Sequence, residues 1–502
     1  MTEQANFGDL PRAWRESQGA AIVDVGSPQR PERTISYAEF NAHCDAFARG
    51  LRRSGLGPGA RIAILSLNRL ECLVALFGAP RALVVPVPIN VKLPASTVGF
   101  ICADAGVRMV FAEQAFAHLV PAGLSCMALE TDWERFLDPG PFAPVATRAD
   151  DVALQIYTSG TTGRPKGVLL GHAGQVWNAR VLSNSRRLDA SSAILISAPL
   201  YHKNALIASK ISAAAGGRSI LLPRFDARAY IAAIGRHRVT SLSGVPTMYQ
   251  LMLAERDALA ATDVSSVRAV SVGSAAASAT LLQSLQATFP SAQVTANYGL
   301  TEGGPVPFGV HPFDKPRPPG SVGYPLSGVE CRLVGGPSPD EGVLWTRNPG
   351  IMSGYHNLPD KTAERLVDGW LDTQDVLRRD SEGFYYFVGR ADDMFKCGGE
   401  SVYPGEVAGV LERHGDVMQA AVIPVADALK GQVPVAFIVV RPGARRDEAA
   451  IKAFAIANAP AYMHPRRIVF IDALPLTGTN KVDLKALSDL APTLAPRTRE
   501  TA

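Results

Sequence analysis

The chain has 502 residues, and the 47% that are hydrophobic are enough to form a large buried core in roughly two to four structural units. Its net charge of +4 is too small to indicate binding to nucleic acid, and no apolar run reaches the roughly 18 residues of a membrane-spanning helix. The start of the chain lacks an export signal, and six scattered cysteines without metal-ligand spacing predict the reduced thiols of a cytoplasmic protein.

Residues 37–115 alternate between helical and strand-like patterns, which predicts parallel βα units. Helices are expected at 40–51 and 71–83, and strands at 61–66 and 84–87. The glycines of the stretch 55–60 have the spacing of a dinucleotide-binding loop. The stretch follows a helix and precedes a strand, however, whereas that motif follows a strand and precedes a helix. It therefore predicts a helix C-cap and a turn.

The stretch 157–168 is the feature around which the other motifs are arranged. It follows the apolar run 152–156, which predicts a buried strand. Its glycines can turn backbone N–H groups inward, its hydroxyl groups are hydrogen-bond donors, and Lys166 adds a fixed positive charge. Together these groups predict a cradle for a polyphosphate. The spacing is not that of a P-loop, because Pro165 stands where that motif has Gly before its Lys.

Five more strands are predicted beyond this loop, with helical patterns in most of the gaps. They are expected at 194–196, 219–222, 240–243, 269–272 and 293–296. Polar motifs stand just past several strand ends, at Thr158–Thr162, at His202, at Gly273-Ser274 and at 298–302. Because open α/β sheets bind ligands at the carboxyl ends of their strands, these motifs are expected to converge on one edge of the sheet.

The C-terminal part of the sequence predicts a separate small α+β unit. A helix is expected at 404–411, strands at 420–425 and 436–440, a helix at 449–459 and a strand at 468–471. We place the boundary at 390–393, which gives a large domain of residues 1–389 and a small domain of residues 390–502. The tail from Ala491 is predicted to be disordered.

Six motifs in this order resemble those of the adenylate-forming superfamily, which includes acyl-CoA synthetases, aryl-CoA ligases, peptide-synthetase adenylation domains and luciferases. The resemblance covers about residues 30 to 487. It implies an α/β fold, with a large N-terminal domain of parallel βα units and a small mobile α+β C-terminal domain. It also implies that ATP activates a carboxylic acid as its acyl-AMP, which then passes to a thiol.

The resemblance implies a role for particular residues in binding ATP or AMP. Tyr298 would stack on the adenine, Asp375 and Arg390 would hold the ribose, and Lys481 would bridge the acid and the α-phosphate. Gln374 stands where the superfamily usually has Gly, so a positive φ there would be strained. The full nucleotide set is Thr158, Ser159, Gly160, Thr161, Thr162, Lys166, Gly273, Ser274, Ala275, Asn297, Tyr298, Gly299, Thr301, Asp375, Arg390 and Lys481.

The resemblance implies further roles in metal binding, in catalysis and in the second half-reaction. Mg²⁺ would be held by Glu302 and Thr158, and Asp392 would be the hinge between the two domains. The catalytic set is Lys481, Glu302, Thr301, His202 and Lys166. The substrate pocket would include Tyr201, His202, Gly273, Gly304 and Val306, and the thiol tunnel would include His202, Lys396, Gly398 and Gly399. Residues 199–204 resemble the gate segment that separates the acid pocket from the thiol tunnel in the superfamily.

The leading function is an acid:CoA ligase for a medium-chain or aryl acid, acting as a monomer or homodimer. One alternative is loading of the acyl group onto the phosphopantetheine of an acyl carrier protein, and a remote one is an inactive nucleotide-binding regulator. Amino-acid-activating relatives have an Asp about where His202 stands, so an acid with an uncharged tail is expected here. Lys203 is either a solvated charge or a contact for a second polar group on the substrate or the thiol donor.

Overall fold

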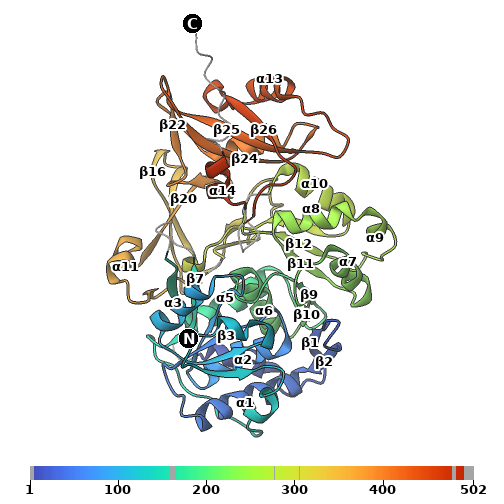
Figure 1. The fold of residues 1–502 in the computed structure, drawn as a ribbon, viewed down its shortest axis with the longest axis vertical. Coiled ribbons are helices and arrows are strands. Elements are labelled where there is room, and N and C mark those ends of the chain that lie inside the picture. The colour runs from blue at the N-terminus through green and yellow to red at the C-terminus, as the bar shows by residue number, and fades with distance from the viewer. Residues whose placement is uncertain (1–4, 159–163, 276, 305, 477–481, 491–502) are drawn as a thin grey trace.

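The computed structural model describes residues 5–158, 164–275, 277–304, 306–476 and 482–490. Figure 1 shows a large unit, coloured blue to yellow, with a small orange and red unit stacked on one end of it. This is the predicted α/β fold, a large N-terminal domain of parallel βα units followed by a smaller α+β domain.

The first parallel sheet has four strands in the order β4-β3-β5-β6. Helix α1 ends at Arg53 and Gly55 has a φ of 74°, so the predicted C-cap and turn before β3 are confirmed. Neighbouring residues of β3 face opposite sides of the sheet: Ile62 shares a core with α1 and α2, and Ala63 shares one with α3. The elements are α1 (Tyr37–Arg53), β3 (Arg61–Leu65), α2 (Leu70–Arg81), β4 (Val85–Pro88), α3 (Ala95–Ala105), β5 (Val107–Ala112) and β6 (Ser125–Ala128).

The second sheet has seven strands in the order β13-β12-β11-β9-β10-β1-β2, and only its edge pair β1–β2 is antiparallel. The five strands predicted beyond the phosphate loop are all present, as β9 to β13. The strands are β1 (Ala20–Asp24), β2 (Arg33–Ser36), β9 (Ala193–Ile196), β10 (Arg218–Leu221), β11 (Ser241–Gly244), β12 (Ala269–Val272) and β13 (Gln293–Ala296). The intervening helices are α6 (Lys203–Ala215), α7 (Ala227–Arg236), α8 (Pro246–Ala254), α9 (Arg256–Ala260) and α10 (Ala279–Thr288).

The predicted phosphate loop does not belong to the seven-stranded sheet, and this corrects the expectation that all motifs share one sheet edge. Strand β7 (Val152–Thr158) pairs antiparallel with β8 (Lys166–Gly171), which in turn pairs antiparallel with β18 (Gly354–Tyr355). The loop therefore closes a hairpin in a separate three-stranded sheet. A short apolar run does not reveal whether its partners are parallel or antiparallel, so the sequence could not distinguish the two arrangements.

A five-stranded antiparallel sheet, which the sequence analysis did not predict, connects the large unit to the small one. Within β20, Gln374 has a φ of 58°, which confirms that a residue other than Gly occupies a left-handed position there. The elements of this region are β16 (Glu330–Ser338), β17 (Glu341–Arg347), α11 (Pro359–Arg365), β19 (Leu366–Val367), β20 (Trp370–Arg379) and β21 (Tyr385–Arg390).

The small unit contains every element that was predicted for it. A sheet built mainly on β24 and β25 has one core on each face, around Ile438 on one side and Phe437 on the other. Strand β21 ends at Arg390 and the first core residue of the small unit is Phe395, which favours the proposed boundary at 390–393. The elements are β22 (Phe395–Cys397), β23 (Glu400–Val402), α12 (Pro404–Leu411), β24 (Val417–Asp427), β25 (Gly431–Val440), α13 (Glu448–Asn458), β26 (Arg467–Phe470) and α14 (Leu484–Leu490).

Two further expectations can be compared with the described residues. All six cysteines lie within them and are free thiols, as expected. Across the same residues, no helix combines the length and the apolar character that a membrane crossing requires. The tail from Ala491 lies outside the described part of the chain.

Helix α6 carries a lysine into the core of the large unit. Lys210 is only 2% exposed, and its Nζ donates a hydrogen bond to Oε1 of Gln175 at 2.6 Å. No carboxylate of the described chain forms an ion pair with it. Burial lowers the pKa of Lys210 from 10.5 to about 7, because the ammonium form loses its hydration without gaining a counter-charge.

We therefore expect Lys210 to make stability depend on pH. Between pH 7 and 10.5 the unfolded lysine binds a proton that the folded one does not, so the free energy of unfolding rises with pH across that window. Lys210→Met should be more stable than the native chain at pH 7, and this difference should shrink toward pH 10.5 by up to about 1.4 kcal/mol per unit. Urea unfolding at several pH values measures it, with the exposed Lys361→Met as control. A difference that stays constant with pH would contradict the prediction.

Candidate active site

A cavity with about 440 Å³ of empty space, open to solvent, lies where β11, β12 and β13 end and α6 begins. Of the predicted nucleotide residues, Gly273, Ser274, Asn297, Tyr298 and Gly299 line it, and so does the predicted pocket residue Val306. Tyr201, His202 and Gly304, which were also assigned to the acid pocket, are not among its lining residues. The full lining is Arg186, Lys203, Asn204, Ile207, Ala208, Ser243, Ser271, Gly273, Ser274, Asn297, Tyr298, Gly299 and Val306.

The turn after β12 is built from small residues, as predicted. The backbone N–H of Gly273 donates to the carbonyl of Gly244 at 3.0 Å, so the hydrogen bonds between β11 and β12 continue to the first residue of the turn. Ser274 has a φ of 67°, a left-handed conformation that costs free energy for a residue with a Cβ. A strained position at a cavity wall is typical of a functional site, and the sequence analysis did not anticipate it.

Tyr298 joins the seven-stranded sheet to the antiparallel sheet. Its hydroxyl donates a 2.6 Å hydrogen bond to Oδ2 of Asp375, and its ring stacks on Phe387 with centroids 6.1 Å apart. Tyr298 is 8% exposed and Asp375 is 6% exposed, and burial raises the pKa of both side chains. Stacking on adenine and binding of the ribose remain predictions for these two residues, which the structure brings together at the cavity.

Arg390 connects this pair to the predicted hinge. Its Nη1 donates to Oδ1 of Asp375 at 3.2 Å, while its Nε and Nη2 donate to the two carboxylate oxygens of Asp392 at 2.7 and 3.0 Å. The backbone N–H of Ala391 donates to the carbonyl of Gln374 at 2.8 Å. The predicted hinge therefore starts from a residue that also contacts the predicted ribose site.

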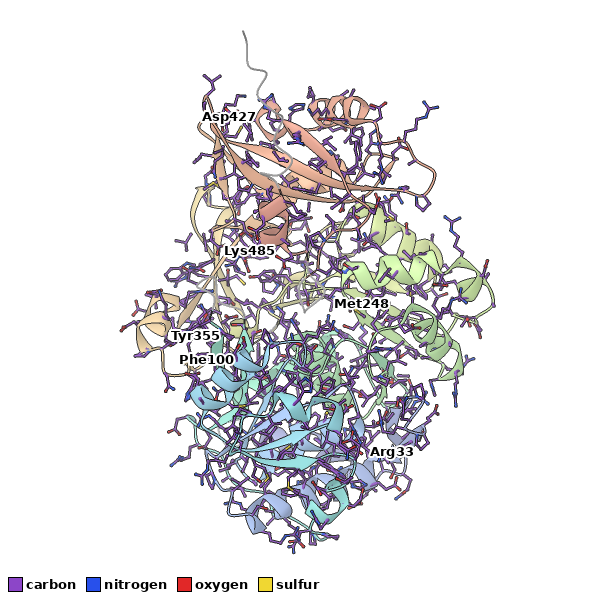
Figure 2. All side chains as sticks on the ribbon, in the orientation of Figure 1. Arg33, Phe100, Met248, Tyr355, Asp427 and Lys485 are labelled. Atoms are coloured by element: carbon purple, nitrogen blue, oxygen red, sulfur yellow. The ribbon has the colours of Figure 1, made fainter. Side chains whose placement is uncertain are left out.

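A second group of predicted residues meets around Tyr355, which the sequence analysis did not identify. The Tyr355 hydroxyl donates to Oε1 of Glu302 at 3.0 Å, and Nζ of Lys166 lies 4.7 Å from the centroid of its ring. Burial, followed by the charge of Glu302, raises the pKa of Tyr355, so it remains a donor. Figure 2 shows Tyr355 on the large unit, on the same side as Phe100. No motif or periodicity marked it in the sequence.

The residues around Glu302 fit the chemistry of a magnesium site. Thr158 is the strand partner of Lys166, so the hairpin places a hydroxyl, an ammonium group and a carboxylate in one neighbourhood. No cluster of three or more metal-ligating side chains occurs in the described part of the chain. Mg²⁺ usually takes one or two carboxylates and completes its shell with water and substrate phosphates, so a single carboxylate such as that of Glu302 is enough for it.

Helix α6 begins at the predicted gate segment. His202 is the N-cap residue of α6, and Lys203 is its first residue. Lys203 is half-buried, lines the cavity and donates from its Nζ to the carbonyl oxygen of Gly299. The interpretation of Lys203 as a solvated surface charge is therefore wrong, because its side chain is half-buried and its ammonium group binds the backbone of Gly299.

Other predicted residues lie away from this cavity or outside the described residues. Gly398 and Gly399 have φ values of 61° and 93° and form the turn between β22 and β23, and Nζ of Lys396 donates to Oγ of Ser401 at 2.8 Å. Lys396, Gly398 and Gly399 are not among the residues that line the cavity. Thr301 is buried and lines a second, smaller cavity, while Ala275 is exposed on the turn after β12. Ser159, Gly160, Thr161, Thr162 and Lys481 lie outside the described residues.

Tyr355→Phe tests the hydroxyl that orients Glu302. The ring remains beneath Lys166, so only the hydrogen bond is lost. We expect the rate of adenylate formation to fall by about tenfold, the scale of one hydrogen bond to a charged group, and the Mg²⁺ requirement to rise. Initial rates of pyrophosphate release against Mg²⁺ concentration measure both effects. Tyr386→Phe is the matched control, because it removes a comparable 2.8 Å bond to Asp380 elsewhere; equal effects in both variants would contradict the prediction.

The comparisons with known proteins agree with these motifs. The chain matches the AMP-binding enzyme family over residues 12–356 and the AMP-binding enzyme C-terminal domain over residues 406–481. A feruloyl-CoA synthase from an Amycolatopsis species is 34% identical over 89% of this chain and 92% of its own length. A fatty acid–[acyl-carrier-protein] ligase, ScoC from Streptomyces coeruleorubidus, is 32% identical over 91% of this chain and 92% of its own length.

Solved structures are similar over nearly the whole chain. The anthranilate CoA ligase AuaEII, in complex with anthranoyl-AMP, has a TM-score of 0.89 and 26% identity, with 98% of this chain and 99% of that chain covered. The chain therefore belongs to the AMP-binding enzyme family, within the adenylate-forming superfamily.

Proposed function

We propose that the protein is an AMP-forming acid–thiol ligase that activates a medium-chain or aryl carboxylic acid with ATP and transfers the acyl group to coenzyme A. The observation that carries this proposal is the cavity at the carboxyl ends of β11 to β13, next to the Tyr298–Asp375 pair. Family membership supplies the reaction class, and the feruloyl-CoA synthase relative supports an aryl acid.

In the first half-reaction a carboxylate oxygen of the acid attacks the α-phosphorus of ATP. The new O–P bond forms as the bond to the β-phosphate bridging oxygen breaks, so pyrophosphate leaves and a mixed anhydride remains. Two anions must approach each other, and the ammonium groups of Lys166 and Lys203 reduce that repulsion. Mg²⁺ at Glu302 and Thr158 would neutralise phosphate charge, and we assign the remaining charge contact to Lys481.

In the second half-reaction a thiol attacks the acyl carbon and AMP leaves. Figures 1 and 2 show α14, which carries Lys485, on the side of the small unit that faces the large unit. Helix α14 starts at Leu484, three positions after Lys481 in the sequence, and we infer that this arrangement suits adenylation. The Gly398–Gly399 turn lies near Lys430 of the small unit instead. We infer that rotation about Asp392 exchanges these two segments.

Two thiols are candidates for the acyl acceptor, with coenzyme A as the first. The relative ScoC is named as an acyl-carrier-protein ligase, so a carrier-bound phosphopantetheine remains the second candidate. A catalytically inactive regulator is disfavoured, because the sequence keeps Lys166, Glu302 and Lys481, to which the charge contacts of the reaction are assigned. Gate and tunnel roles for His202 and Lys396, a cytoplasmic location and a monomeric or dimeric state remain predictions.

Acid-dependent exchange of pyrophosphate into ATP tests the proposed function. We expect exchange with some C4–C10 or aryl acids and none with free amino acids. Lys481→Ala should lower exchange by about 10²-fold, the scale of one charged donor in the transition state, while thioester formation from supplied acyl-AMP continues. Coenzyme A and a phosphopantetheinylated carrier are then compared as acceptors. Exchange with amino acids alone, or equal loss of both steps in the variant, would contradict the proposal.

Asp392→Pro tests the hinge. Proline fixes φ near −65° and restricts the residue before it, so one of the two backbone states should be lost. We expect adenylation to stay within a few-fold of the native rate and thioester formation to fall by about 10²-fold, because the arrangement that suits adenylation is retained. Asp392→Ala is the matched control, since it removes the same ion pair to Arg390 but leaves φ free. If alanine and proline have the same effect, the chain bends elsewhere.

A further inference from the structure

The cavity contains a guanidinium group that the proposed reaction does not use. Arg186 is the residue that ends α5 (His172–Ser185), and its side chain lines the cavity. Among the described residues no carboxylate forms an ion pair with it, and no side-chain hydrogen bond satisfies it. Burial lowers the pKa of Arg186 to about 10.

A second guanidinium group lies close enough to add to this charge. Arg317 donates from Nη1 to the carbonyl of Ala296 and from Nη2 to the carbonyl of Gly309, both at 2.9 Å. Its Nε is buried without a hydrogen-bond partner, and no carboxylate of the described residues pairs with it. Burial, and after it the charge of Arg186, lowers the pKa of Arg317 to about 10. The two arginines therefore repel each other.

This arrangement is costly without a ligand. A buried charge that lacks a counter-charge destabilises the folded state, and a second charge of the same sign increases the cost. The neighbouring Arg187 has the usual environment of an arginine, because it lies at the surface and forms an ion pair with Asp314 at 2.5 Å. Arg186 has the same side chain one position earlier in the sequence but turns into a cavity to which the described residues contribute no acidic side chain.

The position of Arg186 indicates whether its anionic partner belongs to ATP or to the acid substrate. The residues around the proposed magnesium site, namely Lys166, Tyr355 and Glu302, do not line this cavity. The triphosphate is therefore expected beside this cavity rather than within it. The remaining cavity wall is part apolar and part polar, with Ile207, Ala208 and Val306 beside Asn204, Ser243 and Ser271. Such a wall suits the body of a small acid with a polar far end.

We propose that the acid substrate carries a second anionic group, a carboxylate or a sulfonate, which binds Arg186 at the end of the molecule away from the activated carboxylate. This inference rests on the proposed function and replaces the uncharged tail that the sequence analysis expected. The fixed positive charge of Arg317 strengthens the site, and Asn204, whose Oδ1 accepts from Oγ of Ser243 at 2.6 Å, has its amide nitrogen left to donate.

Matched acids test the proposal in the full-length enzyme. The probes are terephthalate and 4-sulfobenzoate against benzoate, and adipate against hexanoate, each followed by pyrophosphate exchange. We expect kcat/KM for an acid with an anionic tail to exceed that of its neutral partner by about 10²-fold, as expected for a site built around a polar group. The two aryl probes show whether a carboxylate or a sulfonate is preferred.

Substitution at Arg186 locates the effect. Arg186→Gln should lower the ratio of kcat/KM between anionic and neutral acids by about 10²-fold, and Arg186→Lys should retain part of it. Arg187→Gln is the matched control and should leave the ratio and the rates unchanged, because Arg187 is 74% exposed. Thermal unfolding and ATP binding verify that each variant folds.

The outcomes separate this inference from the proposed function. If neutral acids are activated and Arg186→Gln leaves the ratio unchanged, the inference is wrong and the proposed function stands. If Arg186→Gln raises only the KM for ATP, the guanidinium serves the nucleotide and the inference is likewise wrong. If no acid of either kind supports exchange, the proposed function itself fails.

Discussion

The Asp375 carboxylate is the contact on which the arrangement of the site depends. It accepts one hydrogen bond from Tyr298, which follows β13, and one from Arg390, which ends β21. Two segments, one of them far from Asp375 in the sequence, are thus held against one buried carboxylate, whose charge is stable only while those donors remain. Since Arg390 also binds Asp392, a ligand that competes for Asp375 would act directly on the proposed hinge.

The charges around this contact are divided between two regions. On one side Lys166 and Glu302 meet at Tyr355, where the triphosphate and Mg²⁺ are expected. On the other side Lys203 and Arg186 line the cavity where the acid is expected. The reaction brings negative charge from both sides to the α-phosphate, so fixed cations on each side lower its electrostatic cost without moving. Gly299, whose carbonyl accepts from Lys203, lines the same cavity as Lys203 and Arg186.

Much of the fold could be predicted because its elements repeat local patterns. Strands β9 to β13 and every element predicted for the small unit appear near the predicted positions, since apolar periodicity and the turn residues between them are local properties. The hairpin of β7 and β8 and the sheet formed by residues 330–390 were not anticipated. Strand partners there are chosen by contacts between distant residues, and a short apolar run carries no information about them.

The residues of the site also fall into those that the sequence identifies and those that only the folded chain identifies. Motif residues such as Tyr298, Asp375 and Glu302 could be identified because their order along the chain is characteristic, whereas Tyr355 and Arg186 belong to no motif. Arg186 and Arg187 are adjacent residues of the same type. Because α5 ends at this point, one side chain faces the cavity and the other faces the solvent. The residues that determine the substrate are therefore those whose role depends most on packing. For this reason the acid's tail had to be inferred from uncompensated charge in the folded chain, and that charge favours an anion over the uncharged tail expected from His202 alone.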